Sequence, residues 1–244
     1  MNSIPSTTGA IVFGRMSSSR LPGKMLMDIE GQTLSECVLA RIELSIPRER
    51  IVFATSTDSS DTPLADFVAS KGYRIFRGPL ENVARRALDC ARQHGFENWL
   101  RVCGDRPFSP WEVADRALQL HHATHADLTT TTPGKTWPAG ATVEVVRTSA
   151  LERILRDTTD TDDLEHVTRF FYNNVEAFRI EPVQNKTPWP KELSLVIDTP
   201  EDLEKIRYIA SKLGTQSITA KLDEVCSLAM DWHKYQQHAK EQQD

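Results

Sequence analysis

Short apolar runs alternate with segments of helical periodicity through the first half of this sequence. The runs have the length and β-branched content of buried strands, and they occupy residues 9–13, 51–55, 73–76 and 98–103. The helical segments lie between and after them, at residues 33–45, 61–71, 81–94 and 110–122. Because parallel strands need crossover connections, this order predicts an α/β fold with a mainly parallel central sheet covered by helices.

The regular alternation ends near residue 125. The later segments are predicted to be strands at 127–132, 141–147 and 193–197, and helices at 149–155, 164–173, 201–213 and 218–242. No internal repeat or low-complexity linker divides the chain. We therefore expect one domain over residues 1–213, followed by a helical appendage over residues 214–244.

Composition narrows the class of protein. The chain has 244 residues, 39% of them hydrophobic, and a formal charge of −5, which argues against global disorder and against a nucleic-acid partner. No apolar run is long enough to span a bilayer, and residues 1–10 lack a signal-peptide pattern, so we expect a cytoplasmic protein without a membrane partner. The scattered cysteines, predicted to be structural, are Cys37, Cys90, Cys103 and Cys226.

Residues 15–24 (RMSSSRLPGK) form a cation-rich loop directly after the first predicted strand. Ligands of α/β sheets bind at the carboxyl ends of the strands, where this loop lies. Arg15, Arg20 and Lys24 would neutralise a triphosphate, and Gly14 and Gly23 allow the backbone to approach a ligand closely. The loop matches neither the GxxxxGK[ST] nor the GxGxxG pattern.

Two aspartates follow predicted strands, Asp105 after 98–103 and Asp198 after 193–197. Both carboxylates should therefore converge at one edge of the sheet. Mg²⁺ binds few carboxylates together with phosphate oxygens, so this pair is the candidate metal site. A turn residue at Asp105 and a helix N-cap at Asp198 are the structural alternatives.

Seven segments in one order resemble a known family. They are 15–24, 54–58 with Asp61, 76–78 with Asn82, Val83 and Arg86, 101–107 (RVCGDRP), 138–145, 165–168 (EHVT) and 197–203 (IDTPEDL). Together they resemble the SpsF-like cytidylyltransferase family, related to the CMP-KDO and CMP-sialic acid synthetases, over residues 10–205. The resemblance implies a single-domain, Rossmann-like nucleotidyltransferase fold (GT-A-like), with residues 1–213 as its catalytic domain.

The same resemblance implies a reaction. CMP would pass from CTP to an acidic acceptor with release of pyrophosphate, in glycan or surface-polysaccharide precursor synthesis. The acceptor would be either a 2-keto-3-deoxy sugar acid or a phosphate or phosphonate. The implied catalytic residues are Lys24, Asp105 and Asp198, with Mg²⁺ on the two aspartates.

The remaining site residues divide between the two substrates. The expected nucleotide-binding residues are Gly14, Arg15, Ser19, Arg20, Lys24, Arg77, Gly78, Arg86 and Gly104. The expected acceptor-binding residues are Arg106, His166 and Arg169. The family often has Cys or Glu where this chain has Arg106, which puts the acceptor preference in question.

Two other functions stay open at this stage. A GT-A glycosyltransferase would hold a sugar nucleotide through an Asp-x-Asp string, and residues 160–162 match it, although their acidic surroundings favour a solvated loop. A non-catalytic nucleotide-binding protein is the other alternative function.

Helix 218–242 fits either a homodimer interface or packing on its own domain. Three histidines (His121, His122 and His125) lack zinc spacing and are expected to be solvated.

Overall fold

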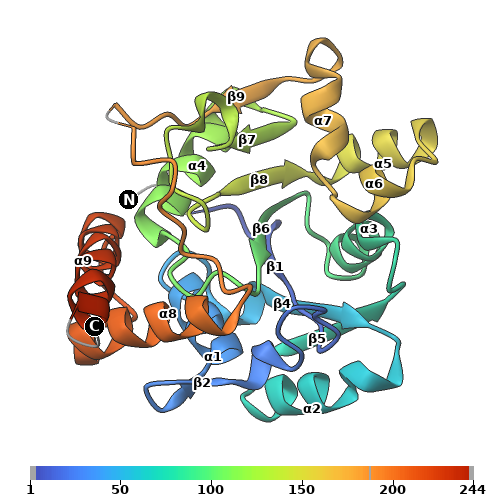
Figure 1. Cartoon of the computed structure of the whole chain (residues 1–244). Coiled ribbons are helices and arrows are strands. Elements are labelled where there is room, and N and C mark those ends of the chain that lie inside the picture. Colours follow the sequence, from blue (N-terminus) through green and yellow to red (C-terminus); the bar gives the residue numbers. More distant parts are fainter. Residues whose placement is uncertain (1–3, 187, 242–244) are drawn as a thin grey trace.

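A mixed seven-stranded sheet forms the centre of the molecule (Figure 1). The computed structural model describes residues 4–186 and 188–241. Within these residues the strand order is β5 (Arg74–Gly78), β4 (Ile51–Ser56), β1 (Thr8–Phe13), β6 (Asn98–Cys103), β8 (Glu144–Arg147), β7 (Leu128–Thr130) and β9 (Ile180–Pro182). In this sheet β8 alone runs against its neighbours. The predicted mainly parallel α/β fold is therefore confirmed.

Helices cover both faces of this sheet. They are α1 (Leu34–Ile42), α2 (Thr62–Ser70), α3 (Val83–Gln93), α4 (Trp111–Thr124), α5 (Thr148–Asp157), α6 (Thr161–Glu165), α7 (Arg169–Asn173), α8 (Pro200–Leu213) and α9 (Leu222–Glu241). A small ribbon of β2 (Asp28–Ile29) and β3 (Gln32–Thr33) precedes α1. None of the helices in the described part of the chain is both long and apolar enough to cross a membrane.

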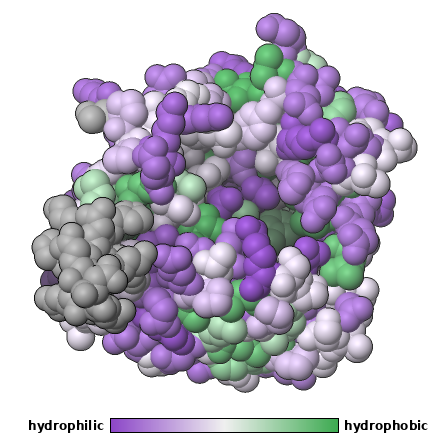
Figure 2. Space-filling model, in the orientation of Figure 1, coloured by the Kyte–Doolittle hydropathy of each residue, from purple (hydrophilic) through white to green (hydrophobic). Residues whose placement is uncertain are grey.

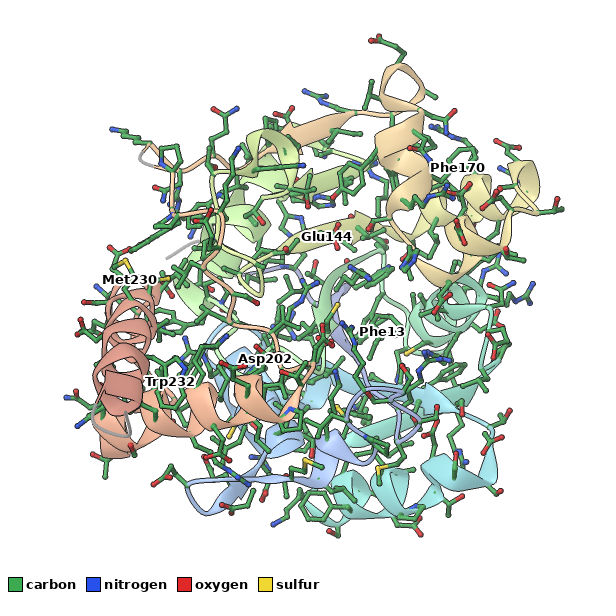
Figure 3. The ribbon with its side chains drawn as sticks, in the orientation of Figure 1. Phe13, Glu144, Phe170, Asp202, Met230 and Trp232 are labelled. Atoms are coloured by element: carbon green, nitrogen blue, oxygen red, sulfur yellow. The ribbon has the colours of Figure 1, made fainter. Side chains whose placement is uncertain are left out.

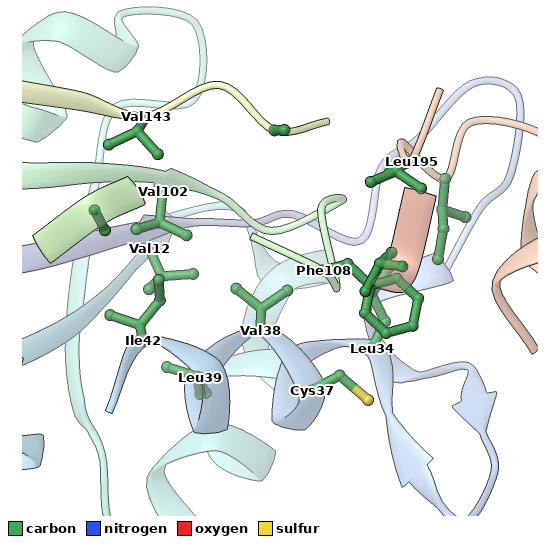
Figure 4. Close-up of a cluster of buried hydrophobic side chains, with 14 of the residues drawn as sticks. Val12, Leu34, Cys37, Val38, Leu39, Ile42, Val102, Phe108, Val143 and Leu195 are labelled. Carbon is green, nitrogen blue, oxygen red and sulfur yellow. The ribbon is translucent and has the colours of Figure 1, made fainter. Parts of the chain in front are cut away.

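The core lies in two layers, one on each face of the sheet. Val12 of β1 belongs to a cluster with α1, α4, α8 and α9, and Figure 4 shows it beside Val38 and Ile42 of α1. Its neighbour Ile11 belongs to the cluster formed by α3, α5 and α7. Successive strand residues point to opposite faces, so a strand covered on both sides must be apolar throughout. This is why residues 9–13 read as an unbroken apolar run.

The second half departs from the predicted elements in three places. The predicted helix at 164–173 is instead α6 and α7, separated by Val167, whose positive φ of 43° interrupts the helix. Residues 193–197 are not a sheet strand, because they pair with loops: Leu195 N donates to Ala139 O and Ile197 N donates to Asp105 O. Strand β9, which runs parallel to β7, was not predicted.

The histidine prediction is wrong for His121. Its ring is 1% exposed and hydrogen-bonds to Thr129 and Asn98. Burial, together with the nearby His122 and Arg147, lowers the pKa of His121 to about 3. The ring is therefore a neutral core group rather than a solvated imidazole.

Arg41 is a fully buried cation that ties the C-terminal segment to the core. Its guanidinium donates to four main-chain carbonyls, those of Ser109, Ser217, Ile218 and Ala220. These carbonyls lie after β6 and before α9, and α9 packs against α8. Burial lowers the pKa of Arg41 to about 10, so the group stays charged at neutral pH.

Candidate active site

The carboxyl ends of β1 and β6 lie side by side and open into a pocket. Phe13 is in register with Cys103, and Gly104 N donates to Phe13 O at 2.7 Å. The pocket has a volume of about 390 Å³ and lies beyond these strand ends. Hydrophilic side chains gather around the hollow near the centre of this face in Figure 2. The position is the one expected for a ligand site in an α/β sheet.

The loop at residues 15–24 is held in place by Asp61, which is fully buried. The Asp61 carboxylate accepts from Met16 N at 2.7 Å, and from the amide and hydroxyl of Ser56. Burial opposes ionisation of Asp61, but these hydrogen bonds outweigh it and hold its pKa below the usual value. The Asp61 carboxylate therefore fixes the start of the loop at residues 15–24.

The end of the same loop aims Lys24 into the site. Gly23 adopts a left-handed conformation, with φ of 75°, before the short turn Lys24–Leu26. Lys24 Nζ lies 3.4 Å from Asp105 Oδ2, 3.2 Å from Asp198 Oδ1 and 2.6 Å from Ile197 O. The two aspartates, 93 positions apart in the sequence, thus contact one ammonium group.

The carboxylate of Asp198 faces the site cations, because Asp198 is not the N-cap of the helix that follows it. Thr199 is the N-cap of α8, in a capping box with Asp202. The carboxylate of Asp198 is bound by cations on both oxygens, since Arg20 lies 2.9 Å from Oδ2. The structural alternative of an N-cap at position 198 is therefore wrong.

The two aspartates fit a divalent cation by their donor set. Asp105 Oδ1 is buried and has no hydrogen-bond partner among the described residues. A buried carboxylate oxygen without a partner is costly, and a metal ion would satisfy it. Carboxylate oxygens are also ligands that Mg²⁺ prefers.

Close neighbours leave no room for a Cβ at positions 14 and 104. A Cβ at Gly14 would lie 2.6 Å from Phe53 Cζ and 2.9 Å from the Met25 methyl, and one at Gly104 would lie 2.7 Å from the same methyl. At Gly104 the Cβ would also lie 2.8 Å from Phe13 O. Both glycines therefore permit close packing within the protein.

The structure brings most of the predicted residues together. Those that line the pocket are Gly14, Arg15, Ser19, Arg20, Lys24, Arg86, Gly104, Asp105, His166 and Asp198. Arg86 is almost fully buried and donates to Leu80 O at 3.2 Å, while its Nε has no hydrogen-bond partner in the part of the chain that the structure describes. Burial and the nearby cation of Arg15 lower the pKa of Arg86, against the opposing effect of Asp61.

Four predicted residues lie outside the pocket lining. Arg77 donates to Ser56 O, Asp58 O and the Thr62 hydroxyl, and Gly78 follows it at the end of β5.

The other two are Arg106 and Arg169. Arg106 Nε lies 3.9 Å from Asp105 Oδ1. Arg169 is paired with Asp160, the N-cap of α6, and with Asp163 on α6. Their substrate-binding roles, like those of Arg77 and Gly78, stay predictions.

Arg101 and a buried carboxylate beneath the pocket were not predicted as site residues. Arg101 lines the pocket, and its Nη1 lies 2.5 Å from Glu144 Oε2. Glu144, labelled in Figure 3, also accepts from the Tyr172 hydroxyl at 2.6 Å. Burial opposes ionisation of Glu144, but Arg101 and the hydroxyls of Tyr172 and Thr168 hold its pKa below the usual value. The sequence signal that could have identified this residue is the position of a glutamate inside the apolar run 143–146.

The Asp-x-Asp string does not form a metal site. Asp160 caps α6 through the amides of Asp162 and Asp163, and it pairs with Arg169. Its side chain is exposed at the surface. No cluster of three or more metal-ligating side chains occurs in the part of the chain that the structure describes.

The parallel strand ends, the cation-rich loop and the two aspartates define a nucleotidyltransferase of the α/β class. A family model described as "Cytidylyltransferase" matches residues 9–242. The spore coat polysaccharide biosynthesis protein SpsF of Bacillus subtilis (strain 168) is 31% identical over 213 residues, which cover 84% of this chain and 86% of that protein. The chain belongs to the cytidylyltransferase family and is an enzyme of that type.

Solved structures show the same fold. A cytidylyltransferase from Leptospira borgpetersenii superposes with a TM-score of 0.86 at 23% identity, over 93% of this chain and 95% of that one. A CMP:2-keto-3-deoxy-manno-octonic acid synthetase in complex with CTP superposes with a TM-score of 0.66 at 17% identity, over 85% and 99% of the two chains. The nucleotidyltransferase-like fold predicted from the sequence is confirmed.

Proposed function

We propose that this cytidylyltransferase transfers CMP from CTP to a small acidic acceptor, with release of pyrophosphate and with Mg²⁺ as its metal. The observation that supports this most directly is the convergence of Asp105, Asp198 and Lys24 at the strand ends, beside the loop at 15–24. The CMP:2-keto-3-deoxy-manno-octonic acid synthetase, whose name includes a sugar acid, is consistent with an acidic sugar as the acceptor, and SpsF is named for polysaccharide biosynthesis.

In the proposed reaction an acceptor oxygen forms a bond to the α-phosphorus of CTP as the bond from that phosphorus to pyrophosphate breaks. Such a transfer depends on positioning and charge neutralisation. Asp105 and Asp198 would hold the metal, which when bound polarises the α-phosphate. Arg15 and Arg20 would neutralise the departing pyrophosphate from the loop.

The acceptor would enter on the side of the pocket lined by His166, which is exposed there. Arg106 and Arg169 stay candidates for binding its acidic group. Their present partners are carboxylates, so an acidic acceptor would have to compete with Asp105 and with the acidic residues of α6.

Calorimetric titration of CTP, UTP, ATP and GTP, each with and without Mg²⁺, tests the nucleotide half of this proposal. The proteins are the wild type, Asp105→Ala and the control Asp66→Ala, whose carboxylate is exposed on α2. Selective CTP binding that weakens without Mg²⁺ or without Asp105, but not in the control, supports the proposal. Binding of no triphosphate overturns it.

Pyrophosphate release tests the acceptor half. The wild type is incubated with CTP and Mg²⁺, and with a panel of sugar acids, phosphate monoesters and phosphonates. Release that depends on one acidic class identifies the acceptor class. Release with neutral sugars alone would contradict an acidic acceptor.

A further inference from the structure

Lys24 uses every donor that its ammonium group has. The ammonium has three hydrogens, and the three acceptors around it are Asp105 Oδ2, Asp198 Oδ1 and Ile197 O. The side chain is 10% exposed. In this arrangement Lys24 has no donor left for a phosphate oxygen.

The same contacts place Lys24 against the proposed metal ligands. Oxygens of both aspartates face its Nζ, and Arg20 takes the second oxygen of Asp198 from an exposed position (65% exposed). A divalent cation on these carboxylates would lie close to the Lys24 ammonium. Like charges repel most strongly where solvent screens them least, as it does around this buried lysine.

We infer that Lys24 is a resident counter-ion that weakens binding of a divalent cation to Asp105 and Asp198 until a nucleotide draws its ammonium away. This inference rests on the proposed function, because it takes the two aspartates as the metal ligands.

The phosphate oxygens of a triphosphate are acceptors that can replace the carboxylates now bonded to the Lys24 ammonium. Lysine is a flexible point charge that binds phosphate well, and Lys24 stands at the end of the phosphate-binding loop proposed above. Mg²⁺ in turn binds few carboxylates and prefers phosphate oxygens as additional ligands. Metal and nucleotide then favour each other's binding, and this coupling is reciprocal.

Binding of Mn²⁺ alone, measured as free Mn²⁺ by electron paramagnetic resonance, tests the inference without any turnover. The variants are Lys24→Met, which removes the charge, and Lys24→Arg, which keeps it. Lys205→Met is the matched control, because Lys205 is also 10% exposed and pairs with Asp202 at 3.1 Å, and Asp202 contacts Asp198 at the Asp198 backbone amide rather than at the Asp198 carboxylate.

Lys24→Met should bind Mn²⁺ at least tenfold more tightly than the wild type, and Mn²⁺ should raise its melting temperature more. Lys24→Arg and the control should match the wild type. Adding Asp198→Asn to Lys24→Met should abolish the gain. Equal or weaker Mn²⁺ binding by Lys24→Met overturns the inference.

If Lys24→Met does not fold, Lys24→Gln replaces it, because glutamine keeps a donor without the charge. The nucleotide titrations separate this inference from the proposed function. If Lys24→Met binds Mn²⁺ more tightly than the wild type but the wild type binds no CTP, the counter-ion role is supported and the proposed function is refuted. CTP binding by the wild type without tighter Mn²⁺ binding in the variant overturns the counter-ion role alone.

Discussion

Replacing Glu144 by leucine should cost this protein about 3–5 kcal/mol of unfolding free energy, the range for leaving a buried charge unpaired. Glu144 is 3% exposed and accepts from Arg101 Nη1 at 2.5 Å and from the Tyr172 hydroxyl at 2.6 Å. Leucine removes the anion and leaves the guanidinium buried. Arg101 Nε already has no hydrogen-bond partner among the described residues, so the loss is not offset there.

The double variant Arg101→Met/Glu144→Leu should cost less than either single change. Both charges are then gone, and apolar side chains of similar volume often replace a buried pair at little cost. Tyr172→Phe should cost about 1.5–3 kcal/mol, the range for one hydrogen bond to a charged group.

Urea denaturation at pH 7 measures these differences through the midpoint and the slope. The control is Glu152→Leu, whose carboxylate pairs with Arg92 at 2.8 Å at the surface, and which should cost less than about 1 kcal/mol. The reasoning fails if Glu144→Leu costs no more than this control, or if the double variant costs the sum of the two single ones.

Three further changes test other parts of the structure. Asp61→Ala strands the buried donors of Ser56 and Met16, so urea denaturation should show a loss of about 1–3 kcal/mol, and calorimetry weaker CTP binding; an unchanged midpoint would contradict this. The depressed pKa of His121 makes stability fall by about 1.4 kcal/mol per pH unit below about pH 6.5, towards its folded pKa of about 3. Urea denaturation at pH 7, 6 and 5 should show that the unfolding free energy of His121→Leu falls less steeply with decreasing pH than that of the wild type. An equal pH dependence of the two proteins would refute this role of His121. Thr199→Ala should lower the melting temperature through a loss of about 1 kcal/mol, and no shift would mean that the cap contributes nothing.

The first half of the chain was readable because local signals and the global fold agree. The segment 33–45 contains α1 (Leu34–Ile42), whose N-cap is Thr33 in a capping box with Glu36. The strand at 98–103 was predicted to the residue. Such agreement comes from strands covered on both faces, where most positions are apolar; Asn98 and Arg101 are the polar exceptions in this strand.

The second half was harder because tertiary contacts decide its conformation. Nothing local marks Val167 as a residue with positive φ, and it alone divides the predicted helix 164–173. Residues 193–197 look like a strand, but their hydrogen bonds go to Ala139 and Asp105. For the same reason the direction of β8, which reverses the sheet pattern, could not be predicted.

Within the site, the loop and Asp105 were predictable because they follow the ends of β1 and β6. Asp198 reaches the site although residues 193–197 are not a sheet strand, because Ile197 N donates to Asp105 O. The partners of each charge were not predictable, since they depend on side chains far apart in sequence. The bridging of Asp105 and Asp198 by Lys24 is an example, and the pair Arg101–Glu144 is another.

The burial of Arg41 also has a consequence for the order of events during synthesis. The first of its three acceptors in the segment before α9, Ser217 O, is 176 residues further along the chain. At a synthesis rate of about 5–20 residues per second, Arg41 therefore waits about 10–35 seconds for that acceptor to be made. Until then its guanidinium depends on water and on Ser109 O for its hydrogen bonds. This layer of the core can close only after most of the chain has been translated.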